Sequence, residues 1–280
     1  MPDRERVEQL PKPAAGGRLL GFDRWWLLFV AVAVLVALMS MVSPDPYWRM
    51  ILFMREGIQV TIAITVVSYL CILLVGLVTG LGRAARSPAI RGIASVYVEV
   101  IRGIPLLVQL YFIYYASPVI IQAIGRYLVK NVPELSGIGQ AMAVATIDEF
   151  AGAVIGLTIC YGAYVGEIYR AGIQSIPRGQ MEAARSLGMS HLQAMRHIIL
   201  PQAIRVILPP LGNEFVALLK DSSLVSAVAV PDMVRRGREF MSKTFIPIET
   251  WTMVALLYLL MTVFSARIVA YIERKTSYVR

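Results

Sequence analysis

Several charged or amide-bearing residues lie in or at the ends of long apolar runs of the sequence, and six of them are candidates for binding a solute. They are Glu99, Arg102, Asn213, Glu214, Lys220 and Asp221. An unpaired charge at membrane depth costs several kcal/mol, so such side chains need an opposite charge, a protein dipole or water. A carboxylate binds an ammonium group and a guanidinium binds a carboxylate, and these are the two charges of a zwitterion. We therefore predict that these residues line a passage for a zwitterionic solute.

Simpler roles for the same residues stay open. Glu99 and Arg102 are three residues apart and can pair with each other on one helix face. Asn213 and Glu214 can act as polar contacts between packed helices. Lys220 and Asp221 are adjacent and do not face each other on a helix. We expect this last pair near the outer end of its apolar segment, where it gates the cavity or fixes the following chain.

The sequence contains no constellation for bond-making chemistry. A phosphate-binding loop requires Gly directly before Lys, and none of the five Lys residues is preceded by Gly. A nucleophile elbow and a metal-ligand cluster are also absent from the sequence. Cys71 and Cys160 lie in separate apolar runs and predict no disulfide framework. We expect no ATPase or other enzymatic activity, no cofactor and no metal.

The segments that must position these residues are membrane-spanning helices. Of the 280 residues, 57% are hydrophobic and 16% are charged, and residues 57–82 contain no charge. Because about 20 apolar residues suffice to cross the hydrocarbon core, we predict an all-α polytopic membrane protein with about six transmembrane helices. The predicted spans are residues 25–42, 57–82, 92–116, a run starting at 150, 204–219 and 251–272.

Several segments need separate interpretation. Residues 1–24 mix Pro, Gly and charges, which predicts a mobile tail. We interpret residues 25–43 as an additional, uncleaved helix rather than a signal peptide, because the run ends without small residues at a cleavage site. In the fifth span, Pro209, Pro210 and Gly212 predict an interrupted helix that borders protein or water. Residues 222–230 are too short to cross and are expected to dip in and return.

The distribution of Lys and Arg predicts the orientation. With both termini inside, 17 of the 27 basic residues fall in inner segments and 9 in outer ones, and Arg102 lies inside a span. This bias favours cytoplasmic termini, although Arg235, Arg236 and Arg238 then lie outside. The net charge of +9 arises from these short connections rather than from one basic face, so we expect no nucleic-acid partner.

The connection between the fourth and fifth predicted spans, residues 175–201, predicts two short helices with a break. Pro177 suits a helix start and Gly188 suits the left-handed position that ends a helix. Ser190 followed by Gln193 is a capping-box pattern. Glu182, Ala183 and Ala184 predict a slim helical face that another protein's groove can approach. An ordinary surface hairpin is the alternative.

This connection resembles the EAA loop of ABC importer permeases. The match consists of Glu182-Ala183-Ala184, three residues, Gly188, nine residues, and a segment that ends in Leu200-Pro201. The resemblance implies a type I importer permease fold with a five-helix core, here with an extra N-terminal helix. It also implies that these residues form a coupling helix for a cytoplasmic ATPase subunit.

Two further segments, residues 97–110 and 211–224, are similar to permeases for polar amino acids such as glutamine, glutamate, histidine and arginine. Ile104, where this subfamily often has Thr, and residues 227–231 depart from its pattern. The resemblance covers about residues 57–272 and leaves the outer segment 117–149 beyond the shared core. The carried amino acid therefore stays open.

The resemblance implies an assembly in a bacterial inner membrane. Its expected partners are an ABC ATPase subunit, an extracytoplasmic amino-acid-binding protein and a second permease chain, identical or homologous, all at the lipid bilayer. An ion-coupled secondary transporter is the second hypothesis, although no internal repeat favours it. A membrane-embedded enzyme or receptor is the third, against which the missing catalytic constellation argues.

Overall fold

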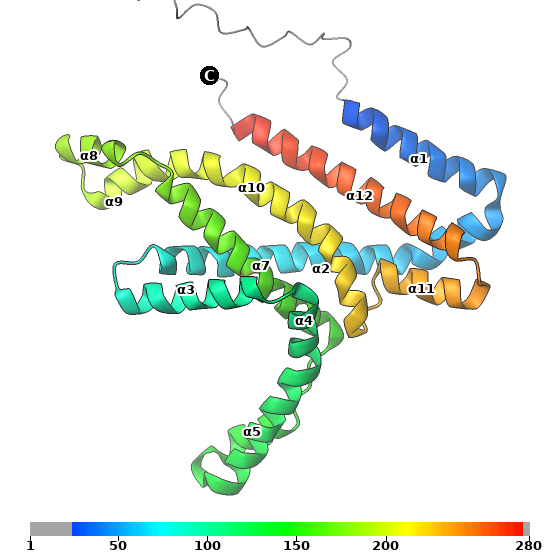
Figure 1. Ribbon diagram of the computed structural model, residues 1–280, viewed down its shortest axis with the longest axis horizontal. Coiled ribbons are helices and arrows are strands. Elements are labelled where there is room, and N and C mark those ends of the chain that lie inside the picture. The colour runs from blue at the N-terminus through cyan, green and yellow to red at the C-terminus, as the bar shows by residue number, and fades with distance from the viewer. Residues whose placement is uncertain (1–23, 277–280) are drawn as a thin grey trace, which may run out of the picture.

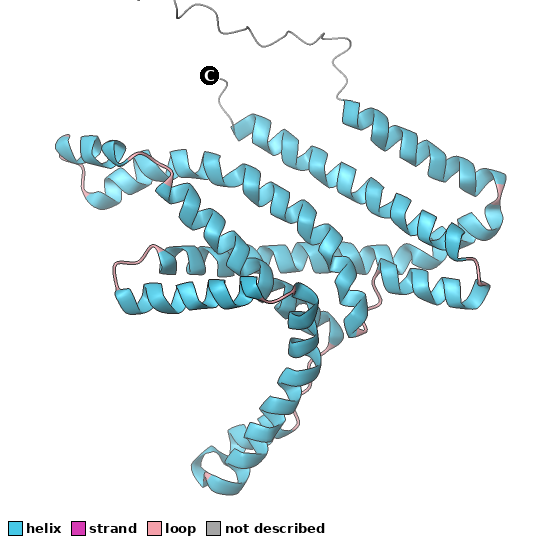
Figure 2. Cartoon of the chain, viewed as in Figure 1, coloured by secondary structure: helices cyan, strands magenta, loops and turns pink. Residues whose placement is uncertain are grey.

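A computed structural model describes residues 24–276, and that range contains helices and no strand. Figure 2 shows the helices joined by short loops. The α-helices are α1 (Arg24–Val42), α2 (Pro44–Arg83), α3 (Pro88–Gly103), α4 (Leu106–Tyr111), α5 (Ser117–Asn131), α6 (Ser136–Ala143), α7 (Glu149–Gln174), α8 (Arg178–Ser186), α9 (His191–Ala194), α10 (Leu200–Asp221), α11 (Met233–Thr244) and α12 (Pro247–Thr276). The predicted tail lies outside the described residues, except for Arg24.

Five helical segments within residues 24–276 are long and apolar enough to span a membrane. They are Trp25–Val42, Pro44–Arg83, Leu106–Asn131, Glu149–Gln174 and Pro247–Thr276. The predicted all-α membrane fold is therefore confirmed. Figure 1 shows α8, α9 and the connection between α2 and α3 toward one end of the bundle, and α11 and the connection between α1 and α2 toward the other.

The third predicted span is wrong as a single helix over residues 92–116. α3 ends at Gly103, Ile104 is extended, and Pro105 precedes α4. Proline lacks an N–H donor and disfavours helical backbone in the residue before it, which explains the break. The chain then stays helical from Leu106 to Asn131 through a π-helical turn, Phe112–Ala116, so part of the expected outer segment is helix.

The predicted interruption of the fifth span is also wrong. α10 stays helical from Leu200 to Asp221, with Pro209 and Pro210 inside it. The missing N–H groups of Pro209 and Pro210 leave the carbonyls of Arg205 and Val206 without their usual helical donors, and the Tyr69 hydroxyl of α2 donates to α10 nearby, at the Leu211 carbonyl oxygen, at 2.9 Å. Membrane helices tolerate proline where neighbouring helices surround the affected turn. α10 packs against α2, α7 and α12 but is not among the five apolar segments.

The centre of the bundle is the pair formed by α2 and α7. Each helix carries two glycines four residues apart, Gly76 and Gly80 on α2 and Gly162 and Gly166 on α7. A Cβ atom at Gly80 would lie 2.8 Å from the Gly166 carbonyl oxygen. Small residues at this spacing allow membrane helices to approach closely. The α2–α7 contact therefore depends on the absence of side chains.

The α5–α6 hairpin extends away from the rest of the bundle (Figure 1). α5 and α6 pack mainly against each other, and a Cβ atom at Gly125 would lie 2.6 Å from the Gly139 carbonyl oxygen. The hairpin occupies most of residues 117–149, which the sequence predicted as an outer segment beyond the shared core, with its topology left open.

As predicted, the segment after α10 does not form a seventh span. Ser222–Val228 is a 3₁₀-helix, and Val225 and Val228 within it are fully buried. This segment contacts α2, α4, α7 and α10. It therefore fills the space where these helices converge.

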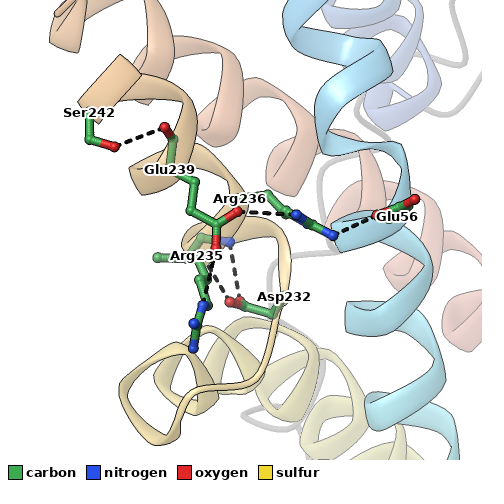
Figure 3. Close-up of polar contacts among 7 residues, drawn as sticks. Glu56, Asp232, Arg235, Arg236, Glu239 and Ser242 are labelled. Atoms are coloured by element: carbon green, nitrogen blue, oxygen red, sulfur yellow. Dashed lines mark hydrogen bonds and ion pairs between the residues drawn. The ribbon is translucent and has the colours of Figure 1, made fainter. Parts of the chain in front are cut away.

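A polar cluster fixes α11 to α2 (Figure 3). The buried Asp232 carboxylate accepts hydrogen bonds from the backbone N–H groups of Val234 and Arg235 at 3.2 and 2.9 Å. Burial raises the pKa of Asp232 to about 6, although these donors favour its ionised form. The Arg236 guanidinium joins Glu56 of α2 at 2.5 Å to Glu239 at 3.1 Å. The cluster gives Arg235 and Arg236, two of the basic residues predicted on the outer side, carboxylate partners on α11 and α2.

Candidate functional site

A cavity of about 420 Å³ lies where the α3–α4 connection meets α7 and α10. Arg102, Glu214 and Asp221, three of the six predicted residues, line this cavity. The other lining residues are Gly103, Ile104, Pro105, Leu106, Cys160, Tyr161 and Tyr164. The cavity therefore combines one guanidinium with two carboxyl groups, as a site for a zwitterion requires.

Two tyrosines of α7 hold the charged side chains of this cavity. The Tyr161 hydroxyl donates to Asp221 Oδ2 at 2.6 Å. The Arg102 Cζ atom lies 5.0 Å from the centre of the Tyr164 ring, a distance that allows a cation–π interaction. Glu214 and Asp221 share one face of α10, because seven residues complete about two helical turns. The charges thus come from α3 and α10 and meet at α7.

Gln109 positions the α3–α4 break that carries Arg102. Its buried side chain donates from Nε2 to the carbonyl oxygens of Ile101 and Ile104, each at 2.8 Å. These bonds satisfy acceptors that the helix end leaves open. Sequence reasoning assigned no role to Gln109, Tyr161 or Tyr164. Gln109 could have been found from the sequence, because an amide side chain is unusual within an apolar run. Tyr161 and Tyr164 could not, because tyrosines are common in such runs.

The structure does not bring the other three predicted residues into this cavity. Asn213 and Lys220 face a second cavity of about 400 Å³ that Arg267 and Glu273 of α12 also line. Glu99 is 78% exposed, and its carboxylate lies 3.8 Å from the Arg83 guanidinium of α2. Glu99 therefore pairs with Arg83 rather than with Arg102.

Arg83, the last residue of α2, connects three helices. Besides Glu99 of α3, its guanidinium contacts Glu167 of α7 at 2.6 Å. Glu167 also forms an ion pair with Arg170, one turn further along α7. This cluster joins the last residue of α2 to α3 and α7.

The α8–α9 hairpin has the predicted break. α8 ends at Ser186, and Gly188 adopts φ +83°, the left-handed conformation expected of it. The Gly188 N–H donates to the Arg185 carbonyl at 3.0 Å and the Met189 N–H donates to the Ala184 carbonyl at 3.2 Å. This pair of bonds is the Schellman motif. Gly188 therefore determines where α8 stops.

The capping box that restarts the chain is confirmed. The Ser190 hydroxyl accepts from the Gln193 N–H at 3.3 Å, and the Gln193 side chain accepts from the Ser190 N–H at 2.8 Å. A π-helical turn, Met195–Ile199, then leads directly into α10, where Leu200 and Pro201 are the first two residues.

The hairpin presents a defined surface. Ala184 and Ala194 are buried inside it, whereas Glu182 and Ala183 are exposed. Leu187 and Leu192 on either side of the break are 84% and 77% exposed. Their exposure on an otherwise polar hairpin marks a surface that suits a protein partner. Sequence reasoning did not single out these two leucines.

Comparisons with known proteins identify a family. The family model described as "Binding-protein-dependent transport system inner membrane component" matches residues 72–278. The glutamine transport system permease protein GlnP of Escherichia coli (strain K12) is 35% identical over 228 residues, which cover 81% of this chain and 94% of GlnP.

The names of two further relatives contain other amino acids. The L-cystine transport system permease protein TcyB of Bacillus subtilis (strain 168) is 40% identical over 183 residues, covering 65% of this chain and 68% of TcyB. The arginine transport system permease protein ArgU of Corynebacterium glutamicum is 34% identical over 270 residues, covering 90% and 79%.

Solved structures show the same fold. A structure described as an amino acid ABC transporter with histidines superposes with a TM-score of 0.68 at 37% identity, covering 85% of this chain and 97% of that one. The MetNI methionine ABC transporter in an inward-facing conformation gives a TM-score of 0.63 at 19% identity, which supports the fold alone.

Proposed function

Because this chain belongs to the family of binding-protein-dependent transport system inner membrane components, we propose that it translocates a polar amino acid as the permease subunit of an ATP-binding-cassette importer. The names of the relatives, with glutamine, cystine and arginine as substrates, support an amino acid as the solute. The comparisons do not support the ion-coupled alternative.

The observation that carries the proposal is the cavity beside α10. Arg102 lines this cavity together with Glu214 and Asp221. The solute's carboxylate binds Arg102 and its ammonium binds Glu214, while Tyr161 holds Asp221 in place. Asn213 and Lys220 lie on a neighbouring face of α10 and act on the second cavity.

The α8–α9 hairpin is the proposed docking site for a separate ATPase subunit. Glu182, Ala183, Leu187 and Leu192 form its accessible surface, and Gly188 sets the angle between α8 and α9. Ala184 contributes to the hairpin interior, and Leu200 and Pro201 start α10, which reaches the cavity. A movement of the hairpin therefore moves the helix that carries Glu214 and Asp221.

The proposal includes the assembly and its orientation. The chain works with an extracytoplasmic amino-acid-binding protein and a second permease chain, identical or homologous, in a bacterial inner membrane with both termini cytoplasmic. Residues 57–272 form the permease domain, residues 25–43 an additional helix, and residues 1–24 and 273–280 the two tails.

Uptake by Glu214→Gln tests the solute site. Removing the charge is expected to lower uptake of the carried amino acid by at least about tenfold, since a charge-assisted hydrogen bond is lost. Glu134→Gln, an exposed residue before α6, serves as the matched control and should transport normally. Normal uptake by Glu214→Gln at wild-type expression contradicts the proposed role.

Co-purification tests the docking site. The wild-type chain extracted from its native membrane in mild detergent should retain an ATPase subunit, and Gly188→Asp should lose it. Gly137→Asp on α6, where a side chain meets open space, is the control for the added charge. A folded wild-type chain that never retains an ATPase argues against the importer assembly.

A further inference from the structure

The charged cavity beside α10 contains more acidic than basic side chains. Among residues 24–276, its lining contains one cationic side chain, Arg102, and two carboxyl groups, Glu214 and Asp221. The carboxylate of a bound amino acid pairs with the guanidinium, and its ammonium pairs with one carboxylate. The second carboxylate then has no counter-charge on the cavity wall or on the head group of the solute. A charge in a partly dehydrated site needs such a counter-charge.

Lys220 does not supply the missing positive charge, although it precedes Asp221 in α10. It lines the second cavity, which Glu273 of α12 also lines. Consecutive residues are about 100° apart around a helix, so the two side chains leave α10 in different directions. The charge of Lys220 therefore belongs to the second cavity.

The ion-pair cluster at Glu167 does not supply it either. Arg83 and Arg170 both contact the Glu167 carboxylate, and the Arg83 guanidinium also lies 3.8 Å from the Glu99 carboxylate. Glu167 interacts electrostatically with Arg102 as well. Two arginines and two glutamates leave this cluster without net charge. The cluster therefore contributes no positive charge that could balance the cavity.

The two carboxyl groups of the cavity share one space. Glu214 and Asp221 interact electrostatically with each other, and both interact with Cys160 and Tyr161 of α7. The Tyr161 hydroxyl donates to Asp221 Oδ2 at 2.6 Å. The other carboxylate oxygen of Asp221 can therefore accept a hydrogen bond from a solute.

The spacing of the two carboxyl groups fits a solute with two cationic groups. Seven residues separate Glu214 from Asp221, which is about 10 Å along the axis of α10. A single ammonium group is too small to contact both carboxylates over this distance. A four-carbon stem with a cationic end, like that of lysine, extends from one toward the other. The cavity volume of about 420 Å³ lies within the range of about 300–1,000 Å³ that is usual for small-molecule sites.

We propose that the solute is an amino acid with a cationic side chain, such as arginine or lysine. Its carboxylate binds Arg102, its ammonium binds Glu214 and its side-chain cation binds Asp221. This inference rests on the proposed function and names the class of its solute. A neutral amino acid leaves Asp221 without a counter-charge, and an acidic one adds a third carboxylate, so the site disfavours both.

Arginine and citrulline are a matched pair of solutes for the test. Citrulline has an uncharged ureido group in place of the guanidinium and is otherwise the same molecule. The permease with its co-purifying subunits is placed in nanodiscs without a binding protein, whose own selectivity is thereby removed. Binding of radiolabelled L-arginine, L-citrulline and L-glutamine is then measured. Arginine should bind at least about tenfold more tightly than the other two, because only arginine forms a charge-assisted hydrogen bond with Asp221.

Two substitutions separate the side-chain contact from the head-group contact. Asp221→Asn should weaken arginine binding by at least about tenfold and leave citrulline binding almost unchanged. Glu214→Gln should weaken the binding of both solutes alike, because both carry the ammonium group. Glu134→Gln, at an exposed position before α6, is the control and should alter neither. If Asp221→Asn does not fold, the ratio of the two affinities in the wild-type protein decides alone.

The outcomes separate this inference from the proposed function. Equal affinities of the wild-type protein for arginine and citrulline, or tighter binding of glutamine, overturn the cationic class and leave amino acid transport in place. An Asp221→Asn variant that loses both solutes equally contradicts the side-chain contact. A failure of all three amino acids to bind at millimolar concentration overturns the proposed solute site, and the inference with it.

Discussion

The α8–α9 hairpin and the charged cavity beside α10 are built in opposite ways. The hairpin takes its shape from residues within one short stretch, where Gly188 ends α8 and Ser190 and Gln193 start α9. The cavity combines Arg102 of α3, Tyr164 of α7 and Asp221 of α10, which are far apart in sequence. The hairpin therefore depends on local backbone geometry, and the cavity depends on the packing of whole helices.

This difference predicts how the two regions respond to substitution. A change in the hairpin should alter its own geometry and the docking of a partner while the bundle stays folded. A change at the α2–α7 contact should remove the cavity together with the bundle, because the cavity has no structure of its own.

The largest effect is expected from Gly80→Leu. A Cβ atom at this position would lie 2.8 Å from the Gly166 carbonyl oxygen and from the Tyr169 Cβ, so the helices must separate. The cost should exceed about 4 kcal/mol and prevent stable folding. Thermal unfolding in detergent measures it, with Gly92→Leu on α3, where the added side chain meets open space, as the control. Equal stability of the two variants would show that α2 and α7 need no close approach.

An intermediate effect is expected for the Tyr161–Asp221 pair. A double-mutant cycle with Tyr161→Phe and Asp221→Asn should give a coupling energy of about 1.5–3 kcal/mol in unfolding, as for hydrogen bonds to charged groups. Uptake should fall in both single variants. Additive effects would mean that the 2.6 Å contact does not position Asp221.

The smallest effect is expected from Gly188→Ala. An alanine in the left-handed conformation costs about 1–2 kcal/mol, so hydrogen exchange at the Schellman amides should accelerate while the melting temperature of the bundle stays constant. Gly179→Ala, within α8 and facing open space, should instead slow exchange slightly. A large loss of global stability in Gly188→Ala would show that the hairpin supports the bundle.

The same contrast explains what sequence reasoning could reach. The membrane class, the break at Gly188 and the capping box were predictable because composition and local backbone chemistry determine them. The continuity of α10 was not predictable, because the packing of its proline-containing turn against α2, α7 and α12 comes from segments far away in sequence. Local rules could have predicted that α3 ends before Pro105. We instead predicted one span over residues 92–116, because the apolar run continues past this proline.

The candidate site was predictable in part for the same reason. Charges in apolar runs pointed to Arg102, Glu214 and Asp221, which meet in the cavity. The same rule also selected Glu99, whose partner Arg83 comes from α2, and Asn213, which faces another side of α10. Tyr161 and Gln109 became evident only from their contacts.

The continuity of α10 has a mechanical consequence. α10 is helical over all 22 residues, and three of its faces meet three environments, namely the charged cavity, the second polar cavity and an apolar groove of about 540 Å³ between α2, α10 and α12. A rotation of about 10° displaces side-chain atoms about 5 Å from the axis by roughly 1 Å. If α10 rotates about its axis as a unit, Glu214, Asn213 and Phe215 therefore shift together, and a change at one face of the helix is felt at the other two.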